Sequence, residues 1–125
     1  KISLENRYYF NTEAVKKYGF ISVLKGASTL ITEPNGTTFI NPTGSWALAT
    51  AGTGDVLTGI IGSLLSQKML NLEAAVSGAF IHGLASDIMA EKTGRTSQIA
   101  TDLFEGIIEV FKKIEKIKYP ENNLF

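Results

Sequence analysis

The sequence predicts a layered α/β fold. Short apolar runs typical of β-strands lie between residues 20 and 40, and longer runs with helical periodicity lie before and after them. One helical run precedes the strands and three follow, so about four helices accompany only a few strands. A layered domain normally buries such helices on a larger sheet. We therefore interpret residues 1–125 as a single partial domain whose missing strands come from elsewhere.

The first helix is predicted over about residues 5–17. Gly19 is expected to end it, because glycine readily adopts the left-handed conformation that follows many helices. The apolar stripe of this helix is expected to consist of Tyr9, Phe10, Ala14 and Val15, with Tyr18 at its end.

Three short strands are predicted next. Residues 20–24 form a mostly apolar run, of the kind buried on both faces of a parallel sheet. Residues 28–32 and 37–40 flank the turn sequence Pro34-Asn35-Gly36. An Asn-Gly turn between two β-type runs is a strong hairpin signal, so these two strands are expected to pair directly.

Three helices are predicted in the second half, over about residues 55–67, 72–92 and from Leu103 onward, with residues 120–125 as a tail. Asn71 is expected to cap the second of them and Thr101 or Asp102 the third, while Gly94 follows the second. Small residues on the second helix should let another helix approach closely: Gly78, Ala79, Gly83 and Ala85. Near the end of the last helix, a solvated basic face is expected from Lys112, Lys113, Lys116 and Lys118.

Composition excludes several classes of protein. Twelve basic residues balance twelve acidic ones, so charge does not favour nucleic acid or an anionic membrane as a partner. No cysteine is present, which excludes disulfides and thiolate metal sites and fits a reducing compartment. No signal peptide is recognised, and no apolar run reaches the roughly 20 residues of a membrane span. We therefore expect a cytoplasmic protein.

The stretch Gly52-Thr53-Gly54-Asp55 has the features of a phosphate-binding turn. Glycines let backbone amides approach an anion closely, and the helix that follows adds unpaired N–H groups and a partial positive charge. An acid in such a turn suggests proton chemistry beside the phosphate. The alternative is that Asp55 is an ordinary helix N-cap.

Other motifs do not fit. A dinucleotide fingerprint needs its third glycine three residues after the second, whereas Gly59 follows Gly54 by five. No lysine follows these glycines, so a Walker A loop is excluded as well. His82 is the single histidine and lies among small residues, so we interpret it as a hydrogen-bonded structural group and expect no zinc site.

Three segments stand out when they are taken together: Lys25-Gly26-Ala27-Ser28-Thr29, Asn41-Pro42-Thr43-Gly44 and Gly52-Thr53-Gly54-Asp55. They are followed by His82-Gly83 and Ala100-Thr101-Asp102-Leu103. In this order the segments resemble the dehydratases that repair hydrated nicotinamide dinucleotides, a branch of the ribokinase-like superfamily. The resemblance extends to about Lys113. It implies that the chain is the C-terminal half of a three-layer αβα sandwich.

The resemblance also implies a chemistry. Family members use ADP or ATP, with Mg²⁺, to phosphorylate the hydroxyl of the S form of hydrated NADH or NADPH, after which phosphate leaves. Asp55 would then be the catalytic base that contacts the substrate hydroxyl, and the amides of Gly52, Thr53 and Gly54 would hold the phosphoryl group. The nucleotide would contact Gly54 and the segment Lys25, Gly26, Ala27, Ser28 and Thr29. No residue is predicted to be a protein ligand of a metal.

Two departures from the family pattern bear on these expectations. Ser45-Trp46 stands where the family usually carries asparagine, often followed by proline, and the N-terminal half is absent. A sheet edge and an apolar face are therefore expected to be exposed, which predicts partial disorder, self-association or pairing with the missing half. The resemblance implies a homo-oligomer. The alternatives are a ribokinase-like kinase of a vitamin-precursor alcohol and a non-catalytic nucleotide-binding module.

Overall fold

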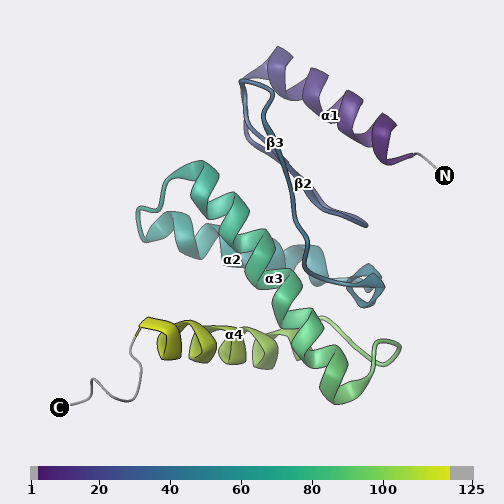
Figure 1. Ribbon diagram of the computed structural model, residues 1–125, viewed down its shortest axis with the longest axis vertical. Coiled ribbons are helices and arrows are strands. Elements are labelled where there is room, and N and C mark those ends of the chain that lie inside the picture. The colour runs from purple at the N-terminus through teal and green to yellow at the C-terminus, as the bar shows by residue number, and fades with distance from the viewer. Residues whose placement is uncertain (1–2, 119–125) are drawn as a thin grey trace.

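The computed structural model describes residues 3–118, so the expected tail at residues 120–125 lies outside the described residues. Helix α1 (Leu4–Tyr18) precedes three strands, β1 (Ser22–Leu24), β2 (Leu30–Thr32) and β3 (Thr38–Ile40). A short 3₁₀ helix, η1 (Trp46–Ala49), leads to three α-helices (Figure 1). They are α2 (Thr53–Ser66), α3 (Asn71–Thr93) and α4 (Asp102–Lys118). Every predicted element is present at nearly its predicted position.

The three strands form an antiparallel sheet in the order β1-β2-β3. The β2–β3 hairpin, with Ile31 opposite Phe39, confirms the Asn-Gly turn. The expectation of a parallel strand at residues 20–24 is wrong for the described sheet, because β1 pairs antiparallel with β2 through Val23 and Ile31. Composition alone cannot distinguish the two pairings, since an apolar run fits any strand that is covered on both faces.

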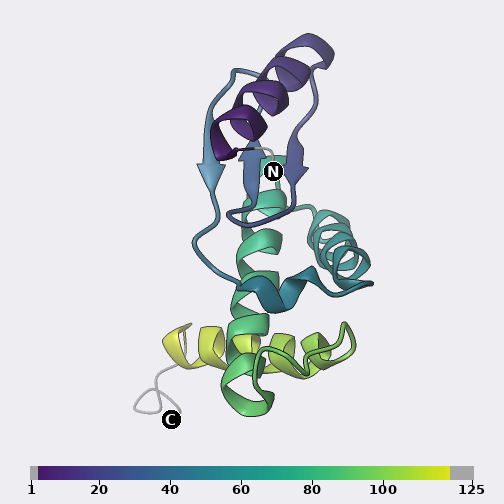
Figure 2. The same ribbon diagram turned by 90° about the vertical axis from the view of Figure 1, so that its right-hand side faces the viewer.

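Helices cover both faces of this sheet, which confirms the three-layer α/β/α arrangement (Figure 2). On one face, Ile31 packs in a cluster with Leu57 of α2 and with two alanines of α3, Ala75 and Ala79. On the other face, the Asn11 amide of α1 donates a 2.8 Å hydrogen bond to the Thr32 hydroxyl. The side chains of successive strand residues point to opposite faces, so β2 is buried by both helix layers.

The apolar stripe predicted for α1 is right for Val15 and wrong for its aromatic residues. Tyr9 and Phe10 are 59% and 65% exposed, whereas Thr12 and Val15 are buried against the sheet. Tyr9 and Phe10 fit a helical repeat in the sequence. The helix nevertheless docks on the strands through a different face, which contains Thr12 and Val15. Gly19 ends the helix as expected, with φ of 70° and its amide bonded to the Val15 carbonyl at 2.8 Å.

The helix boundaries in the second half agree with the predictions except at one cap. Gly94 ends α3 with a positive φ of 78°, and α4 begins at Asp102, directly after Thr101. The Asn71 cap is wrong, because Leu70 is the residue before the first turn and Asn71 is already helical. No side chain caps this helix start within the described residues.

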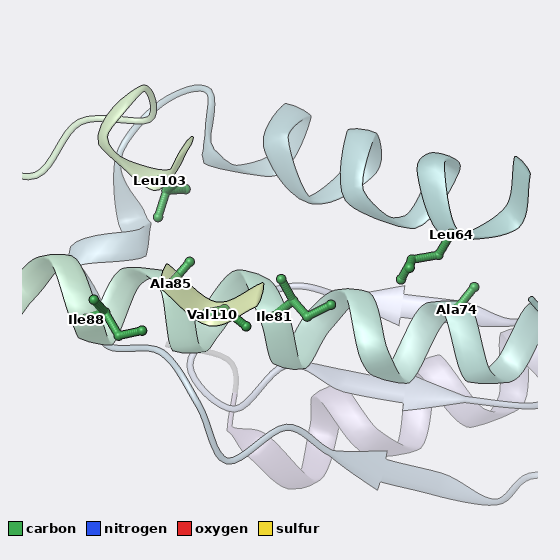
Figure 3. Packing of buried hydrophobic residues seen from close by; sticks show 7 residues of the cluster. All are labelled: Leu64, Ala74, Ile81, Ala85, Ile88, Leu103 and Val110. Carbon is green, nitrogen blue, oxygen red and sulfur yellow. The ribbon is translucent and has the colours of Figure 1, made fainter. Parts of the chain in front are cut away.

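The main core lies where α3 contacts α2 and α4 (Figure 3). The cluster consists of Leu64, Ala74, Ile81, Ala85, Ile88, Leu103 and Val110. A Cβ on Gly106 would lie 2.9 Å from the Ala85 carbonyl carbon, so these two small residues let α3 and α4 approach as predicted. The prediction is wrong for Gly83, which faces the loop at Thr43 instead of a helix.

The basic residues of α4 lie on the surface. Lys112, Lys113, Lys116 and Lys118 are exposed, as expected for a solvated face, and Lys112 pairs with Glu109 at 2.8 Å. Across residues 3–118, no helix combines the length and apolar character needed to cross a bilayer.

Candidate nucleotide site

The glycine-rich turn forms the start of α2. Gly52 is the N-cap, with φ of 85° and ψ of −15°, a conformation that disfavours any residue with a Cβ. An added Cβ would also lie 3.1 Å from the Ala100 methyl. Glycine is therefore required here twice over, by conformation and by the close approach of the segment before α4.

The amides of this turn are only partly used by the protein. Those of Gly52 and Gly54 donate to no acceptor within residues 3–118, while the amide of Thr53 lies 3.4 Å from the Thr50 carbonyl. Two unpaired N–H groups at a helix N-terminus provide an anion-binding position. The predicted anion turn thus has the right donors, with Thr53 the weakest of the three.

Thr53 anchors the turn to its surroundings. Its side chain is only 2% exposed, and its hydroxyl lies 2.8 Å from the Leu48 carbonyl and 2.9 Å from the Thr50 carbonyl. Its own carbonyl lies 2.8 Å from Nε2 of His82. Because a carbonyl oxygen only accepts, Nε2 of His82 carries the hydrogen and donates it. His82 is therefore the buried, hydrogen-bonded group that the sequence predicts.

The ionisation of His82 is shifted by this environment. Burial of the ring is the main cause that lowers its pKa, and the positive charge of Lys25 lowers it further. The hydrogen bond to Thr53 opposes this lowering. Folding therefore shifts His82 toward its neutral form.

Lys25 connects the end of β1 to the same region. Its ammonium group donates to the Leu48 carbonyl at 2.8 Å, the oxygen that also accepts from Thr53. Partial burial lowers the pKa of Lys25. The Leu48 carbonyl therefore joins the predicted nucleotide segment to the predicted anion turn.

The segment Lys25–Thr29 lines a cavity of about 220 Å³. The other walls come from the Asn41–Gly44 loop, from Trp46 and from His82. Ligand cavities of drug-sized molecules are typically about 300–1,000 Å³, so this one holds only part of a nucleotide. The cavity unites the first two of the three segments that carry the family resemblance.

Arg7 holds the nucleotide segment from behind, and the sequence did not indicate it. Its guanidinium donates to the carbonyls of Ala27 at 2.6 Å and Leu24 at 3.1 Å. A Cβ on Gly26 would lie 2.7 Å from Nη2 of Arg7, so glycine makes room for this contact. An arginine on a half-exposed helix carries no sequence signal for such a role.

The Asn41–Gly44 loop is fixed to α3 by side-chain hydrogen bonds. The Asn41 amide donates to the Ala79 carbonyl at 3.0 Å, and the Gly44 amide donates to a carboxylate oxygen of Asp87 at 2.8 Å. Gly44 has φ of 90°, which favours glycine. Asp87 is a second residue that the sequence did not indicate. Trp46 is 61% exposed at the mouth of the cavity.

A buried glutamine supports the loop before the turn. The Ser86 hydroxyl donates to Oε1 of Gln98 at 2.6 Å, and Nε2 of Gln98 donates to the Ser86 carbonyl at 3.0 Å. The Gln98 carbonyl in turn accepts from the Thr50 hydroxyl at 3.2 Å. This chain of bonds runs from α3 to the residue two positions before Gly52, so Gln98 positions the turn.

Asp55 lies apart from this cavity. It is exposed in the first turn of α2 and lines a separate groove between α2 and α4. The alternative role of Asp55 as N-cap is wrong, because Gly52 occupies that position and no side chain within residues 3–118 caps this helix start. The structure links Lys25 to Thr53 of the turn through the Leu48 carbonyl, and it leaves the Asp55 side chain exposed.

The side chains of this site also indicate how it could hold a metal ion. Within residues 3–118, no three His, Asp or Glu side chains gather into a metal-binding cluster. Magnesium commonly relies on one or two carboxylates together with the phosphates of its nucleotide. The site therefore fits an ion that arrives with the nucleotide, and Asp55 is the carboxylate nearest to the anion turn in the sequence.

Comparison with known protein families shows to which family this chain belongs. Residues 1–109 match the family model described as NAD(P)H-hydrate dehydratase. The chain belongs to the NAD(P)H-hydrate dehydratase family. The match covers all three segments around the cavity and the anion turn, and it ends within α4.

Individual members of the NAD(P)H-hydrate dehydratase family agree with this placement. The chain is 48% identical over 101 residues to the ADP-dependent (S)-NAD(P)H-hydrate dehydratase of Neisseria meningitidis, covering 78% of this chain and 33% of that protein. It is 39% identical over 112 residues to the bifunctional NAD(P)H-hydrate repair enzyme Nnr of Moorella thermoacetica, covering 90% of this chain and 21% of that protein.

A solved structure supports the ribokinase-like fold. The ADP/ATP-dependent NAD(P)H-hydrate dehydratase of Bacillus subtilis, co-crystallised with ATP and Mg²⁺, superposes with a TM-score of 0.79 at 32% identity. The match covers 87% of this chain and 39% of that chain. A ribokinase-like superfamily protein of Enterococcus faecalis superposes with a TM-score of 0.70 at 33% identity, over 89% of this chain and 37% of that one. The chain thus spans well under half the length of these relatives.

Proposed function

We propose that this chain carries the nucleotide-binding part of an ADP- or ATP-dependent NAD(P)H-hydrate dehydratase. The observation that carries the proposal is the shared Leu48 carbonyl, which accepts from both Lys25 and Thr53 at 2.8 Å. This shared acceptor supports a site in which the cavity lined by Lys25 and Leu48 holds one part of the nucleotide and the turn that begins α2 holds its phosphates. A nucleotide that lies in the cavity would then direct its phosphates toward Gly52 and Gly54.

The proposed reaction has two steps. The terminal phosphoryl group of ADP or ATP moves to the hydroxyl on the hydrated nicotinamide ring of the S form, and Asp55 accepts the hydroxyl proton. Phosphate then leaves as the C–O bond breaks, and loss of a ring proton restores the double bond of NADH or NADPH. Phosphoryl transfer depends mainly on positioning and fixed donors, which the amides of Gly52, Thr53 and Gly54 would supply.

We infer that the chain is one part of a larger ribokinase-like domain. It spans 33% of the Neisseria relative and 39% of the Bacillus chain. Beside the free edge of β1 lies a hollow of about 540 Å³, lined by apolar side chains that include Phe20, Ile21 and Val23. Such a hollow suits further strands and a helix from the rest of the domain. A cytoplasmic location, where nicotinamide dinucleotides and ADP meet, belongs to the same proposal.

An activity assay tests the proposal. The intact protein that contains this chain would be given hydrated NADPH with ADP or with ATP, in the presence and absence of Mg²⁺. Recovery of NADPH, with AMP or ADP as the second product, is expected. A stable phosphorylated alcohol without NADPH would instead show a small-molecule kinase. Nucleotide binding with no turnover of any substrate would show a non-catalytic module.

A further inference from the structure

His82 contacts the anion turn from the neighbouring helix. It lies on α3, its side chain is only 3% exposed, and its Nε2 atom donates to the Thr53 carbonyl at 2.8 Å. It is the single histidine of the chain. The proposed steps of phosphoryl transfer assign no role to this bond.

The Thr53 carbonyl belongs to the same peptide group as the Gly54 amide. No peptide bond within residues 3–118 is cis, so the C=O and the N–H of this group point in opposite directions. His82 holds the carbonyl end. The Gly54 N–H, which donates to no acceptor within residues 3–118, therefore faces away from the imidazole. The imidazole and a phosphate bound at Gly54 would lie at the two ends of one peptide group.

A hydrogen bond at the carbonyl end of a peptide group strengthens the donor at its other end. The bonded oxygen draws electron density from the nitrogen, so the N–H donates more strongly, as in other chains of hydrogen bonds. A donor that is already oriented also costs no reorganisation when charge moves onto the phosphoryl oxygens. The bond from His82 would thus both orient and strengthen the Gly54 donor.

Thr53 is fixed through its side chain as well. Its hydroxyl lies 2.8 Å from the Leu48 carbonyl and 2.9 Å from the Thr50 carbonyl. With His82 on the main-chain carbonyl, Thr53 is held on both its side chain and its backbone. The peptide group that joins Thr53 to Gly54 therefore has little freedom to rotate.

Close packing of α3 sets the position of His82 itself. A Cβ added to Gly78 would lie 2.5 Å from Cγ1 of Ile61 on α2, and a Cβ added to Gly83 would lie 2.7 Å from the Thr43 carbonyl carbon. Helix α3 is thus in contact with α2 on one side and with the cavity loop on the other. This packing holds the imidazole at a fixed distance from the anion turn.

We propose that His82 is a positioning residue for phosphoryl transfer, and that it acts through the Thr53–Gly54 peptide to aim the Gly54 amide at the terminal phosphate of the nucleotide. This role rests on the proposed function, because it requires that the turn that begins α2 hold that phosphate. His82 does not contact the reacting atoms, and Asp55 remains the proposed base.

NMR spectroscopy of the intact protein, labelled with ¹⁵N, tests the link without any ligand. The Gly54 amide nitrogen should respond to the bond at the preceding carbonyl. His82→Leu removes the donor and is expected to shift this signal upfield, whereas His82→Gln keeps an N–H and should leave it close to the wild-type position. An unchanged Gly54 signal in His82→Leu would overturn the proposal.

Nucleotide binding gives the functional test, with ADP and AMP as a matched pair of ligands. In the intact protein, His82→Leu is expected to weaken ADP binding about 10-fold, as when one hydrogen bond to a charged group is lost. AMP lacks the terminal phosphate, so its affinity should change little. Calorimetry measures both ligands, and His82→Gln should restore most of the affinity for ADP.

Turnover separates positioning from substrate binding. In His82→Leu, kcat for hydrated NADPH should fall about 10–100-fold, less than the roughly 10²–10³-fold cost of losing an anion-hole donor outright. The KM for hydrated NADPH should remain close to the wild-type value, because His82 acts on the nucleotide phosphate alone.

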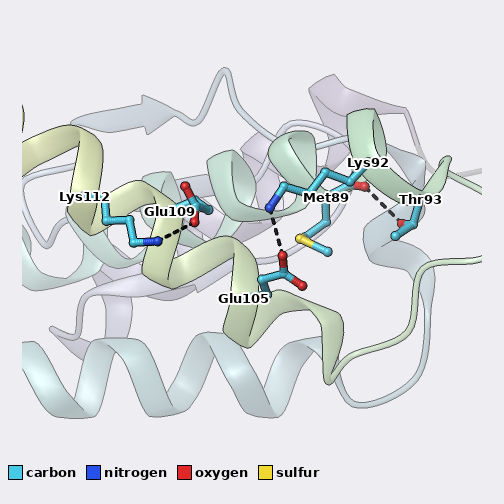
Figure 4. Close-up of polar contacts among 6 residues, drawn as sticks. All are labelled: Met89, Lys92, Thr93, Glu105, Glu109 and Lys112. Atoms are coloured by element: carbon cyan, nitrogen blue, oxygen red, sulfur yellow. Dashed lines mark hydrogen bonds and ion pairs between the residues drawn. The ribbon is translucent and has the colours of Figure 1, made fainter.

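Met89 provides the control for a general loss of stability. It is 2% exposed and follows His82 on α3 by seven residues, about 10 Å along the helix axis. Figure 4 shows it next to Lys92 and Glu105, whose ion pair of 2.8 Å joins α3 to α4. Met89→Ala removes buried volume and destabilises the fold. It should nevertheless leave the ratio of ADP to AMP affinity unchanged.

The outcomes separate the two proposals. Equal losses of ADP and AMP affinity in His82→Leu, the same change of ratio in Met89→Ala, or no rescue by His82→Gln would each overturn the role of His82 and leave the dehydratase proposal standing. A wild-type protein that binds neither nucleotide would contradict the dehydratase proposal. The Gly54 signal would then still decide whether His82 controls this amide.

Discussion

Lys25 and Thr53, which lie on different elements, donate hydrogen bonds to the same carbonyl oxygen, that of Leu48, each at 2.8 Å. Lys25 directly follows β1, and Thr53 is the first residue of α2. A single backbone group in η1 thus sets the distance between the end of a strand and the start of a helix. Thr53 is buried and Lys25 is only partly buried, so water can replace the lost bond at Lys25 more easily than at Thr53.

The first prediction concerns Thr53. Thr53→Val keeps the shape of the side chain and removes the hydroxyl that bonds the Leu48 and Thr50 carbonyls. We expect a loss of about 0.5–1.5 kcal/mol in the free energy of unfolding, the usual net contribution of a hydrogen bond, because the Leu48 carbonyl keeps Lys25 and the Thr50 carbonyl keeps the Thr53 amide as donors. Urea unfolding of the chain measures this. Thr53→Ser retains the hydroxyl and should recover most of the loss; equal losses in both variants would contradict the role of the hydroxyl.

Asp55 provides the second prediction. Asp55→Asn removes the proposed base without changing the size of the side chain, so turnover of hydrated NADPH by the intact protein should fall about 10²–10⁴-fold. Binding of ADP, measured by calorimetry, should change little, because the side chain lies outside the nucleotide cavity. Glu91→Gln, an exposed carboxylate on α3, is the control. Undiminished turnover in Asp55→Asn would exclude Asp55 as the base.

A pair of glycines gives the third prediction. A Cβ on Gly83 would lie 2.7 Å from the carbonyl carbon of Thr43, a backbone atom that cannot swing aside. Gly83→Ala should therefore cost about 1–3 kcal/mol, as expected for overpacking, and displace the loop that lines the cavity. Gly59 has no neighbour within 4 Å of such a Cβ. Gly59→Ala should instead stabilise α2 by about 0.5–1 kcal/mol, and thermal unfolding of both variants checks the difference in sign.

The fourth prediction concerns His82 and pH. Burial lowers its pKa in the folded chain below the ordinary value of 6.5, so the unfolded chain binds more protons just below that pH. Stability should then be constant above about pH 6.5 and fall as the pH decreases through the window between the unfolded and folded pKa values.

His82→Gln isolates this contribution. Glutamine keeps an N–H donor for the Thr53 carbonyl and does not titrate, and His82 is the single histidine of the chain. The slope of unfolding free energy against pH just below 6.5 should flatten in this variant. A slope that is the same in both proteins would assign the pH dependence to carboxylates instead.

The sequence alone determined the order of the elements and the residues of the three motifs. Helical and strand periodicities are local, so α2, α3, α4 and the β2–β3 hairpin were predictable from short windows. Gly19 and Gly94 ended their helices as expected, because a positive φ is a property of a single residue. The family resemblance likewise rested on residues that stand close together in the chain.

Tertiary structure decided which face of each element is used. Val15, and not the aromatic pair Tyr9 and Phe10, faces the sheet, since docking of α1 depends on strands that no local window contains. The roles of Arg7, Asp87 and Gln98 were equally hidden, because each acts through hydrogen bonds to distant backbone groups. The Leu48 carbonyl, which accepts from both Lys25 and Thr53, could not be predicted for the same reason. The anion turn was readable as a motif, but only the folded chain places it beside the nucleotide segment and leaves Asp55 outside their cavity.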